Sequence, residues 1–353
     1  MFLPLLACAQ QGEEGSRPKN VILVVGDGMG VAQVYSSIVA QGGDNSVFLQ
    51  FPVTGFSRTF SYNKYTTDSG AGGTALMTGH KVENYHIAYG PNGEFYPSFL
   101  VLAKERLGKR AGFVVTSSVL DATPASTYAH VSHRHQFDSI SMQMAVSGFD
   151  VMIGGGKKHF LPENRKDGLA PIDTLKARGY KLAYSLLDLA SLKGRKMCWL
   201  LSSESPAKAA ERGNMLTLAT LKAIEALDRN DNGFCLMVEG SQIDWACHNN
   251  DSAYLAGEMA DFENMLRAVL DFAKRDGQTL VIVTADHETG GLTLLDGNIK
   301  EGVSNPTWKT ASHSGVMVPV FSYGPGAECF AGVQQNTDFY NKILHLLQLR
   351  NAR

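Results

Sequence analysis

The chain lacks long apolar runs, an excess of charge of one sign and paired cysteine spacings. Its 353 residues include 32 Lys and Arg against 34 Asp and Glu, a formal net charge of −2. This balance provides no basic field, so we expect no nucleic-acid partner. No apolar run approaches the ~18 residues that cross a membrane. The 5 cysteines form no CxxC or similar pair, so they are a poor guide to the cellular compartment.

Segment 1–19 has the pattern of an export signal or a lipoprotein signal. An apolar stretch from Met1 to Leu6 precedes small residues around Cys8, as in a bacterial lipobox, and a polar, charged stretch follows. The apolar stretch is short and has no basic region before it, which leaves a disordered N-terminus as the alternative. We expect an exported protein, periplasmic or envelope-anchored in a bacterium, with Cys8 as the site of a lipid anchor.

Short apolar, β-branched segments alternate with longer segments of helical periodicity. The apolar segments are nearly continuous, which is typical of strands buried on both faces of a sheet. The alternation predicts an α/β fold, a three-layer α/β/α sandwich with a central, mostly parallel sheet. We expect strands at 21–25, 112–116, 150–153, 234–238, 279–284 and 317–322, and helices near 30–41, 69–79, 97–107, 136–147, 206–229, 252–275 and 337–348.

The sequence predicts one domain over 20–350. It contains no internal repeat, low-complexity tract or clear linker. The least regular stretch, 160–200, is expected to be a surface elaboration. A boundary within 230–250 would separate motifs that we place in one site.

A serine in the segment TDSGAGGTA (67–75) is the first chemical signal. Ser69 lies at an expected helix start, where unpaired N–H groups and the helix dipole favour an oxyanion or a phosphate. The same residue types are also ordinary in loops and helix N-caps. The functional interpretation of Ser69 therefore depends on other parts of the chain.

Three acidic residues, Asp27, Glu239 and Asp286, follow expected strands. The carboxyl ends of strands form the ligand-binding edge of an open α/β sheet, so these carboxylates should converge. Carboxylates this close repel one another unless they hold cations. The segment GDGMG (26–30) lacks the third small residue of a dinucleotide-binding loop. We interpret its glycines as a tight bend that directs Asp27 at a metal.

Imidazoles accompany these carboxylates. Asp244 and His248 are four residues apart and would share a helix face where both could bind one ion, although a surface pair at this spacing is also common. His287 follows Asp286 where the chain is expected to turn, and His313 precedes the last expected strand. Mixed His and carboxylate ligands favour zinc, whereas oxygen ligands alone favour magnesium.

Arg134 is the candidate anion-binding cation, because a guanidinium fork binds two phosphate oxygens at once. The segment DATP (121–124), with Asp121 and Thr123, precedes it. Three histidines beside Arg134 fit no standard ligand spacing, and we expect them to be surface or core residues. They are His130, His133 and His135.

Six separated segments resemble the alkaline phosphatase family. They follow the family's order over about residues 20–348, nearly the whole chain, and six in order are far more specific than any one. The segments are VVGDGMG (24–30), TDSGA (67–71), DATPA (121–125) with Arg134, EGSQIDWACH (239–248), TADHETGG (284–291) and HSG (313–315).

The resemblance implies a homodimeric hydrolase of small phosphate monoesters with two Zn²⁺ and one Mg²⁺. Ser69 would be the nucleophile, forming a phosphoserine intermediate, and Arg134 would bind the phosphate. The implied ligands are Asp244, His248 and His313 for the first zinc, Asp27, Asp286, His287 and Ser69 for the second, and Asp27, Thr123 and Glu239 for magnesium.

Two residues of the implied substrate site depart from common patterns. Asp121 resembles the outer carboxylate of the magnesium site in some bacterial members, whereas Trp245 stands where some relatives have lysine or histidine. This combination leaves metal preference, phosphate affinity and pH optimum open.

Other functions in the same superfamily are the alternatives. A sulfatase needs a C/S-x-P-x-R context, which Ser69 lacks. By the resemblance, diesterases usually lack the third metal site and the arginine, whereas Thr123, Glu239 and Arg134 are present. A non-catalytic metal-binding lipoprotein is a further alternative, which the complete set of ligands and nucleophile disfavours.

Overall fold

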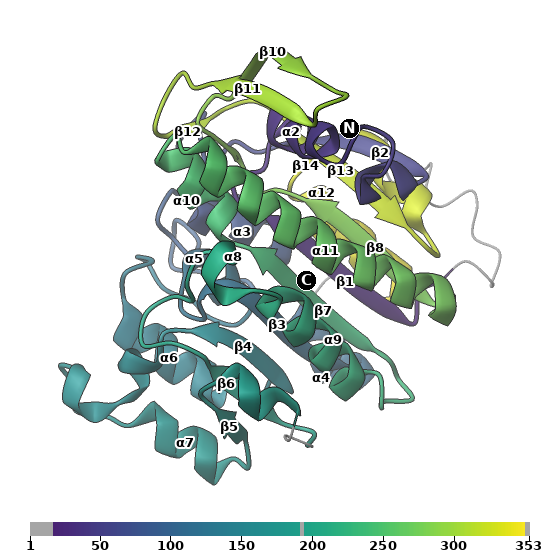
Figure 1. The fold of residues 1–353 in the computed structure, drawn as a ribbon. Helices are drawn as coiled ribbons and strands as arrows, with labels where there is room; N and C mark the ends of the chain where they lie inside the picture. Colours follow the sequence, from purple (N-terminus) through teal and green to yellow (C-terminus); the bar gives the residue numbers. More distant parts are fainter. Residues whose placement is uncertain (1–16, 191–193, 350–353) are drawn as a thin grey trace.

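A ten-stranded sheet runs through the centre of the molecule in the computed structural model, which describes residues 17–190 and 194–349 (Figure 1). Most neighbouring strands are parallel, and β13 (Val318–Tyr323), near one edge, is antiparallel to both of its neighbours. The order is β14 (Gly332–Gln335), β2 (Val53–Arg58), β13 (Val318–Tyr323), β8 (Thr279–Thr284), β1 (Asn20–Gly26), β7 (Phe234–Gly240), β3 (Arg110–Ser118), β4 (Val151–Gly155), β6 (Met197–Leu200) and β5 (Lys181–Ala183).

Helices cover both faces of this sheet (Figure 1). One face packs against α2 (Val31–Ala40), α9 (Met215–Leu227), α10 (Gln242–His248) and α11 (Ser252–Asp276). The other packs against α3 (Ser69–Thr78), α4 (Phe99–Leu107), α5 (Ala122–Ala125), α6 (Phe137–Val146), α7 (Pro171–Ala177) and α12 (Asp338–Leu346). The predicted three-layer α/β/α sandwich with a mostly parallel sheet is confirmed.

The central strand β1 shows why the apolar segments are continuous. Val21, Leu23 and Val25 belong to the core on the α3 and α4 face, whereas Ile22 and Val24 belong to the core on the α9 and α11 face. All five are fully buried, since a strand in the middle layer has no solvent-facing side. Packing on both faces therefore fixes the position of the carboxyl end of β1.

The structure corrects several expected elements. The helix expected at 206–229 is interrupted, because Gly213 at φ +57 ends α8 (Ala209–Arg212) before α9 begins. The stretch 160–200 is not only a surface elaboration, since β6 within it is completely buried in the sheet. Strands missed by the sequence pattern include β2, β5, β6 and β14, the hairpin of β10 (Thr293–Asn298) and β11 (Val303–Thr307), and the pair β9 (Glu288–Thr289) and β12 (His313–Ser314).

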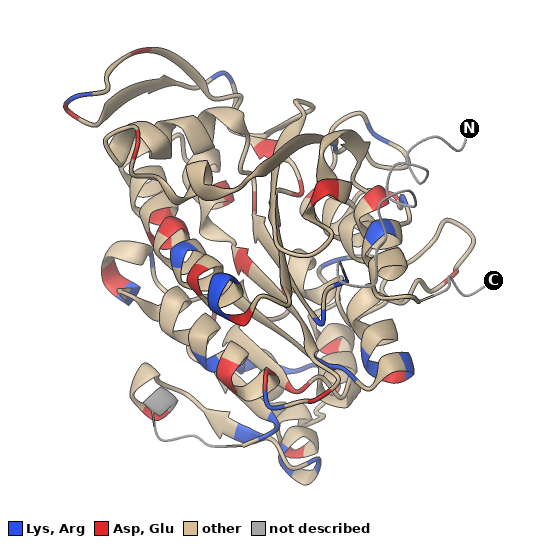
Figure 2. Cartoon of the chain, turned by 90° about the vertical axis from the view of Figure 1, so that its right-hand side faces the viewer, with Lys and Arg blue, Asp and Glu red and all other residues tan. Residues whose placement is uncertain are grey.

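The helices carry charges of both signs (Figure 2), and Cys235, the one cysteine with a predicted environment, is buried as predicted. In the view of Figure 2, basic and acidic residues are interspersed along the helices. Within the described ranges, no helix is both long and apolar enough to cross a membrane. Cys198, Cys235 and Cys247 are free and buried, so Cys235 is the small core residue that its apolar strand predicts.

Candidate active site

Ser69 is the first residue of α3, as the sequence predicts. The N-cap is Asp68, whose Oδ1 accepts a hydrogen bond from the Ala71 N–H at 3.0 Å. The Ser69 hydroxyl is therefore not needed for capping, and its Oγ lies 3.2 Å from His287 Nε2. Glycine allows this approach, because a Cβ on Gly72 would lie 3.0 Å from the Asp286 carbonyl oxygen.

One ligand cluster joins helix α10 to the short strand β12. Asp244 and His248 lie one turn apart on α10, and His248 Nε2 is 3.2 Å from Asp244 Oδ2. His313, in β12, brings its Nε2 to 3.1 Å from His248 Nε2. One ligand atom from each of these three residues lies within 4.8 Å of the others. The three predicted ligands of the first zinc are therefore brought together.

A second cluster adjoins the first and includes the predicted ligands of the second zinc. Ligand atoms of Asp27, Asp244 and His287 lie within 4.8 Å of one another. His287 Nε2 is 3.2 Å from Asp286 Oδ2 and 3.5 Å from Asp27 Oδ1. Asp244 thus lies between the two clusters, a position that its helix spacing alone did not indicate.

The tight bend after β1 brings the two clusters close. Gly28 has φ +71, and a Cβ there would lie 2.8 Å from Thr289 Oγ1 and 2.9 Å from the Asp244 Cα. The sequence interpretation of this loop as a bend at Asp27 agrees with this geometry.

Backbone carbonyls fix the imidazoles of the first cluster. His248 Nδ1 lies 2.7 Å from the Ala311 carbonyl oxygen, and His313 Nδ1 lies 2.9 Å from that of Thr67. Because a carbonyl only accepts, each Nδ1 carries the hydrogen and each Nε2 faces the cluster. Two Nε2 atoms with lone pairs 3.1 Å apart require a cation between them or a proton on one of them.

Thr289 connects the two clusters and was not singled out in the sequence. Its hydroxyl donates to Asp244 Oδ1 at 2.5 Å and lies 3.2 Å from His287 Nδ1. Since the single hydroxyl hydrogen goes to the carboxylate, the hydroxyl accepts from Nδ1–H, and His287 Nε2 keeps its lone pair. Only the folded chain could indicate this role.

A third group, made of oxygen ligands, lies deeper. Asp27, Thr123 and Glu239 are almost completely buried, and Glu239 lies within β7 instead of after it. Several buried side-chain oxygens of the described residues have no hydrogen-bond partner, and three of these oxygens belong to predicted metal ligands. They are Asp27 Oδ1, Thr123 Oγ1 and Asp286 Oδ2. Such orphaned acceptors fit divalent cations.

Protonation states reflect the same crowding of acidic groups. Burial, with the charges of Asp286 and Asp244, raises the pKa of Asp27 well above its usual value. Burial also raises the pKa of Glu239 to about 8 and, with the charge of Asp244, that of Asp286 to about 7. Although burial opposes it, the hydrogen bond with His248 and nearby imidazoles lower the pKa of Asp244 to about 2. Divalent cations would relieve this repulsion.

Arg134 is held between two carboxylates beside Ser69. Its Nη1 donates to Asp68 Oδ2 at 3.1 Å, and its Nη2 donates to Asp121 Oδ1 at 2.9 Å. Burial lowers the pKa of Arg134, but the charges of Asp121 and Asp68 outweigh it and raise that pKa. The sequence did not assign a role to Asp68, although its position directly before the serine was visible.

The remaining predicted residues lie on the flanks of this site. Asp121 is the N-cap of α5, the short helix that carries Thr123. Trp245 follows Asp244 on α10 and is partly buried against the core. Among the nearby histidines, His130 is half-buried, whereas His133 and His135 are exposed.

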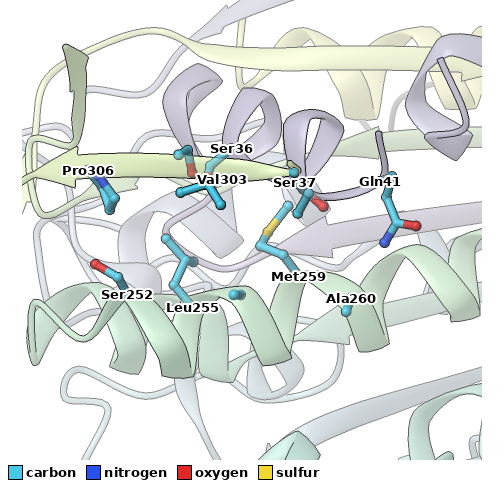
Figure 3. Close-up of a pocket in the computed structure, with 13 residues that line it drawn as sticks. Ser36, Ser37, Gln41, Ser252, Leu255, Met259, Ala260, Val303 and Pro306 are labelled. Carbon is cyan, nitrogen blue, oxygen red and sulfur yellow. Dashed lines mark hydrogen bonds between the residues drawn. The ribbon is translucent and has the colours of Figure 1, made fainter. Parts of the chain in front are cut away.

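A cavity of about 220 Å³ lies elsewhere, between α2, α11 and β11 (Figure 3). Small and apolar side chains line it, including Ser36, Leu255, Met259 and Val303. None of its lining residues is a predicted ligand, so this cavity is separate from the site.

Known proteins resemble the chain over nearly its whole length. The sequence model of the alkaline phosphatase family matches residues 18–305. Alkaline phosphatase 4 of Bacillus subtilis (strain 168) is 34% identical over an alignment that covers 96% of this chain and 92% of that protein.

Solved structures give the same result. The alkaline phosphatase of the Antarctic bacterium TAB5 is 38% identical, superposes with a TM-score of 0.89, and is matched over 95% of this chain and 100% of that one. A mutant of the TAB5 enzyme with Mg bound in its M3 site is 38% identical, with a TM-score of 0.88 over 95% of this chain and 99% of that one. The chain therefore belongs to the alkaline phosphatase family, and it is a phosphatase.

Proposed function

We propose that the protein hydrolyses phosphate monoesters to an alcohol and inorganic phosphate through a phosphoserine intermediate on Ser69. The observation that carries this proposal is the position of Ser69. Its hydroxyl lies at the start of α3, 3.2 Å from His287 Nε2 in one ligand cluster, and the preceding residue, Asp68, holds Arg134. A nucleophile, an anion-binding cation and metal ligands meet at one sheet edge.

We propose three cation sites in this centre, two for Zn²⁺ and one for Mg²⁺. The mixed imidazole and carboxylate groups suit zinc, and the oxygen group suits magnesium. The Mg bound in the related TAB5 mutant supports a magnesium site. Bound divalent cations neutralise negative charge and lower the pKa of coordinated oxygens. The proposed ligands are Asp244, His248 and His313, then Asp27, Asp286, His287 and Ser69, and then Asp27, Thr123 and Glu239.

The protein's own groups account for the course of the reaction. Ser69 Oγ attacks phosphorus in line with the leaving oxygen, so the Oγ–P bond forms while the ester P–O bond breaks. The proton that the Ser69 hydroxyl loses balances the proton that the leaving alkoxide takes up to become the alcohol. Arg134 uses two of its five N–H donors on Asp68 and Asp121, and its remaining donors bind equatorial phosphate oxygens. Water then attacks phosphorus from the opposite side, releases phosphate and restores the Ser69 hydroxyl.

We also propose a single catalytic domain over 20–350, a homodimer, and an exported protein. The ten-stranded sheet includes both β1 and β14, which supports the single domain. The family resemblance supports the homodimer. Most of the signal-like segment 1–19, with Cys8, lies in 1–16, outside the described residues, so sequence alone supports export and a lipid anchor.

Matched aryl phosphate mono- and diesters test the reaction between pH 7 and about pH 10 with zinc and magnesium supplied. We expect monoester hydrolysis that a chelator abolishes. Ser69→Ala should lose turnover by several orders of magnitude while retaining metal. Loss of metal and fold in Ser69→Ala would instead make the serine structural, and preference for the diester would favour a phosphodiesterase.

Arg134→Ala tests the phosphate-binding role separately. The substitution should weaken inhibition by inorganic phosphate, because the remaining cationic groups cannot form its bidentate contact. Inhibition equal to that of the wild type would remove Arg134 from the site.

A further inference from the structure

Tyr85 adopts a backbone conformation that disfavours a large side chain. Its φ is +73, in the left-handed region where the Cβ of an L-residue crowds the following carbonyl oxygen. Side-chain burial does not offset this strain, since the residue is 51% exposed. Strained residues of this kind persist where the surrounding structure holds them, and they cluster at functional sites.

Backbone contacts hold Tyr85 against the phosphate-binding residues. Its N–H donates to Asp68 Oδ1 at 3.0 Å, and the other oxygen of this carboxylate accepts from Arg134 Nη1. Its carbonyl oxygen accepts from the Arg134 backbone N–H at 2.8 Å. Two residues later, Ile87 and Val131 exchange two hydrogen bonds, each 3.0 Å long. The Tyr85 backbone is therefore fixed beside Arg134.

The ring of Tyr85 belongs to a small group of aromatic rings at this rim. It stacks on the exposed His133, with centroids 5.5 Å apart and an angle of 2° between the planes. His133 precedes Arg134 in the chain, and the ring of His135 contacts it at a centroid distance of 5.1 Å but is tilted by 60°, so the stack consists of Tyr85 and His133. The exposed ring of Tyr85 therefore belongs to a residue whose backbone is bonded to Asp68 and Arg134, at the proposed phosphate-binding position.

We propose that Tyr85, with His133 stacked on it, binds a flat aromatic group in the alcohol part of the substrate, as in a nucleoside 5′-monophosphate. This inference rests on the proposed phosphatase reaction at Ser69 and names its substrate class. Every nucleobase has a π face that stacks on tyrosine, whereas an aliphatic alcohol gains little from a flat ring. The backbone contacts to Asp68 and Arg134 hold the ring in register with the phosphate.

Adenosine 5′-monophosphate and ribose 5-phosphate test this proposal, because they share a leaving alkoxide and differ in the base. The measured quantity is the ratio of their kcat/KM values on the metal-loaded enzyme. Stacking of one base predicts a ratio of about five or more. Tyr85→Gly, which removes the ring and suits the positive φ, should bring the ratio close to one. Tyr85→Phe should preserve it.

Controls separate stacking from a structural role. Tyr35 on α2 is similarly exposed at 48%, and Tyr35→Ala should leave the ratio unchanged. A wild-type ratio near one, or an equal loss on both esters in Tyr85→Gly, would overturn the proposal. The equal loss would assign Tyr85 to supporting Asp68 and Arg134.

Binding measurements distinguish failure of this proposal from failure of the phosphatase reaction. Absence of hydrolysis of both esters would contradict the reaction at Ser69. In that case, calorimetry with metal-loaded Ser69→Ala protein still compares the two esters as ligands. Tighter binding of adenosine 5′-monophosphate that disappears on adding Tyr85→Gly supports the stacking role, and equal affinities overturn it.

Discussion

Substitution of Gly28 by alanine tests how closely the bend after β1 approaches the two ligand clusters. A Cβ at this position would lie 2.8 Å from Thr289 Oγ1 and 2.9 Å from the Asp244 Cα. Carbon atoms in contact prefer about 3.5 to 4.0 Å, so the bend or α10 must move. The Asp244 contact is the more costly, because a backbone atom on a packed helix cannot rotate away.

Two contributions set the expected loss of stability. Alanine at φ +71 costs about 1 to 2 kcal/mol of backbone strain. Overpacking against the neighbouring atoms adds about 1 to 3 kcal/mol. The smaller entropy of the unfolded alanine chain offsets about 0.4 to 1 kcal/mol. We therefore expect Gly28→Ala to lower the free energy of unfolding by about 1 to 5 kcal/mol.

Gly168→Ala is the matched control. Gly168 has a similar φ of +65, and no atom lies within 4 Å of a Cβ built there, so only the backbone strain applies. Denaturant unfolding of the metal-loaded proteins gives both values, and metal analysis follows occupancy. Gly28→Ala should be the less stable variant and should lose metal, because Asp244 and Thr289 shift. Equal destabilisation with full metal occupancy would refute the close approach.

Three further predictions concern other contacts. Thr289→Val removes the hydroxyl between the clusters and should weaken metal affinity about 10- to 100-fold in chelator competition; unchanged affinity would exclude a linking role. Arg212→Ala leaves the buried Glu258 and Asp261 unpaired and should cost about 3 to 5 kcal/mol in denaturant unfolding. The exposed pair of Arg229 should contribute less than about 1 kcal/mol, and a similar loss in Arg229→Ala would contradict this difference. Metal removal should lower the melting temperature, because buried carboxylates then repel one another; an unchanged value would argue against cation sites.

Features encoded locally were predictable from the sequence. The apolar runs located β1, β7 and β8, and the spacing of Asp244 and His248 placed both on one turn of α10. The start of α3 at Ser69 was likewise visible, because an acidic N-cap and small residues mark it.

Features that depend on distant partners were not predictable. β6 has only four residues, and it is recognisable as a strand only beside β4. His313 was expected only to precede the last strand, but it belongs to β12, which forms because β9 lies opposite it. The roles of Asp68, Thr289 and Tyr85 depend on atoms more than ten residues away, or on side-chain geometry that no local pattern specifies.

The central position of β1 has a consequence for the order of events during synthesis. β1 is made first among the strands, yet its two neighbours, β7 and β8, end at Gly240 and Thr284. At ribosomal rates of about 5 to 20 residues per second, the interval between the synthesis of β1 and that of these two neighbours lasts roughly 10 to 50 seconds. Both edges of β1 lack their hydrogen-bonding partners during this time. Asp27, at the end of β1, is therefore the first of the proposed metal ligands to be synthesised, and it waits longest for the others.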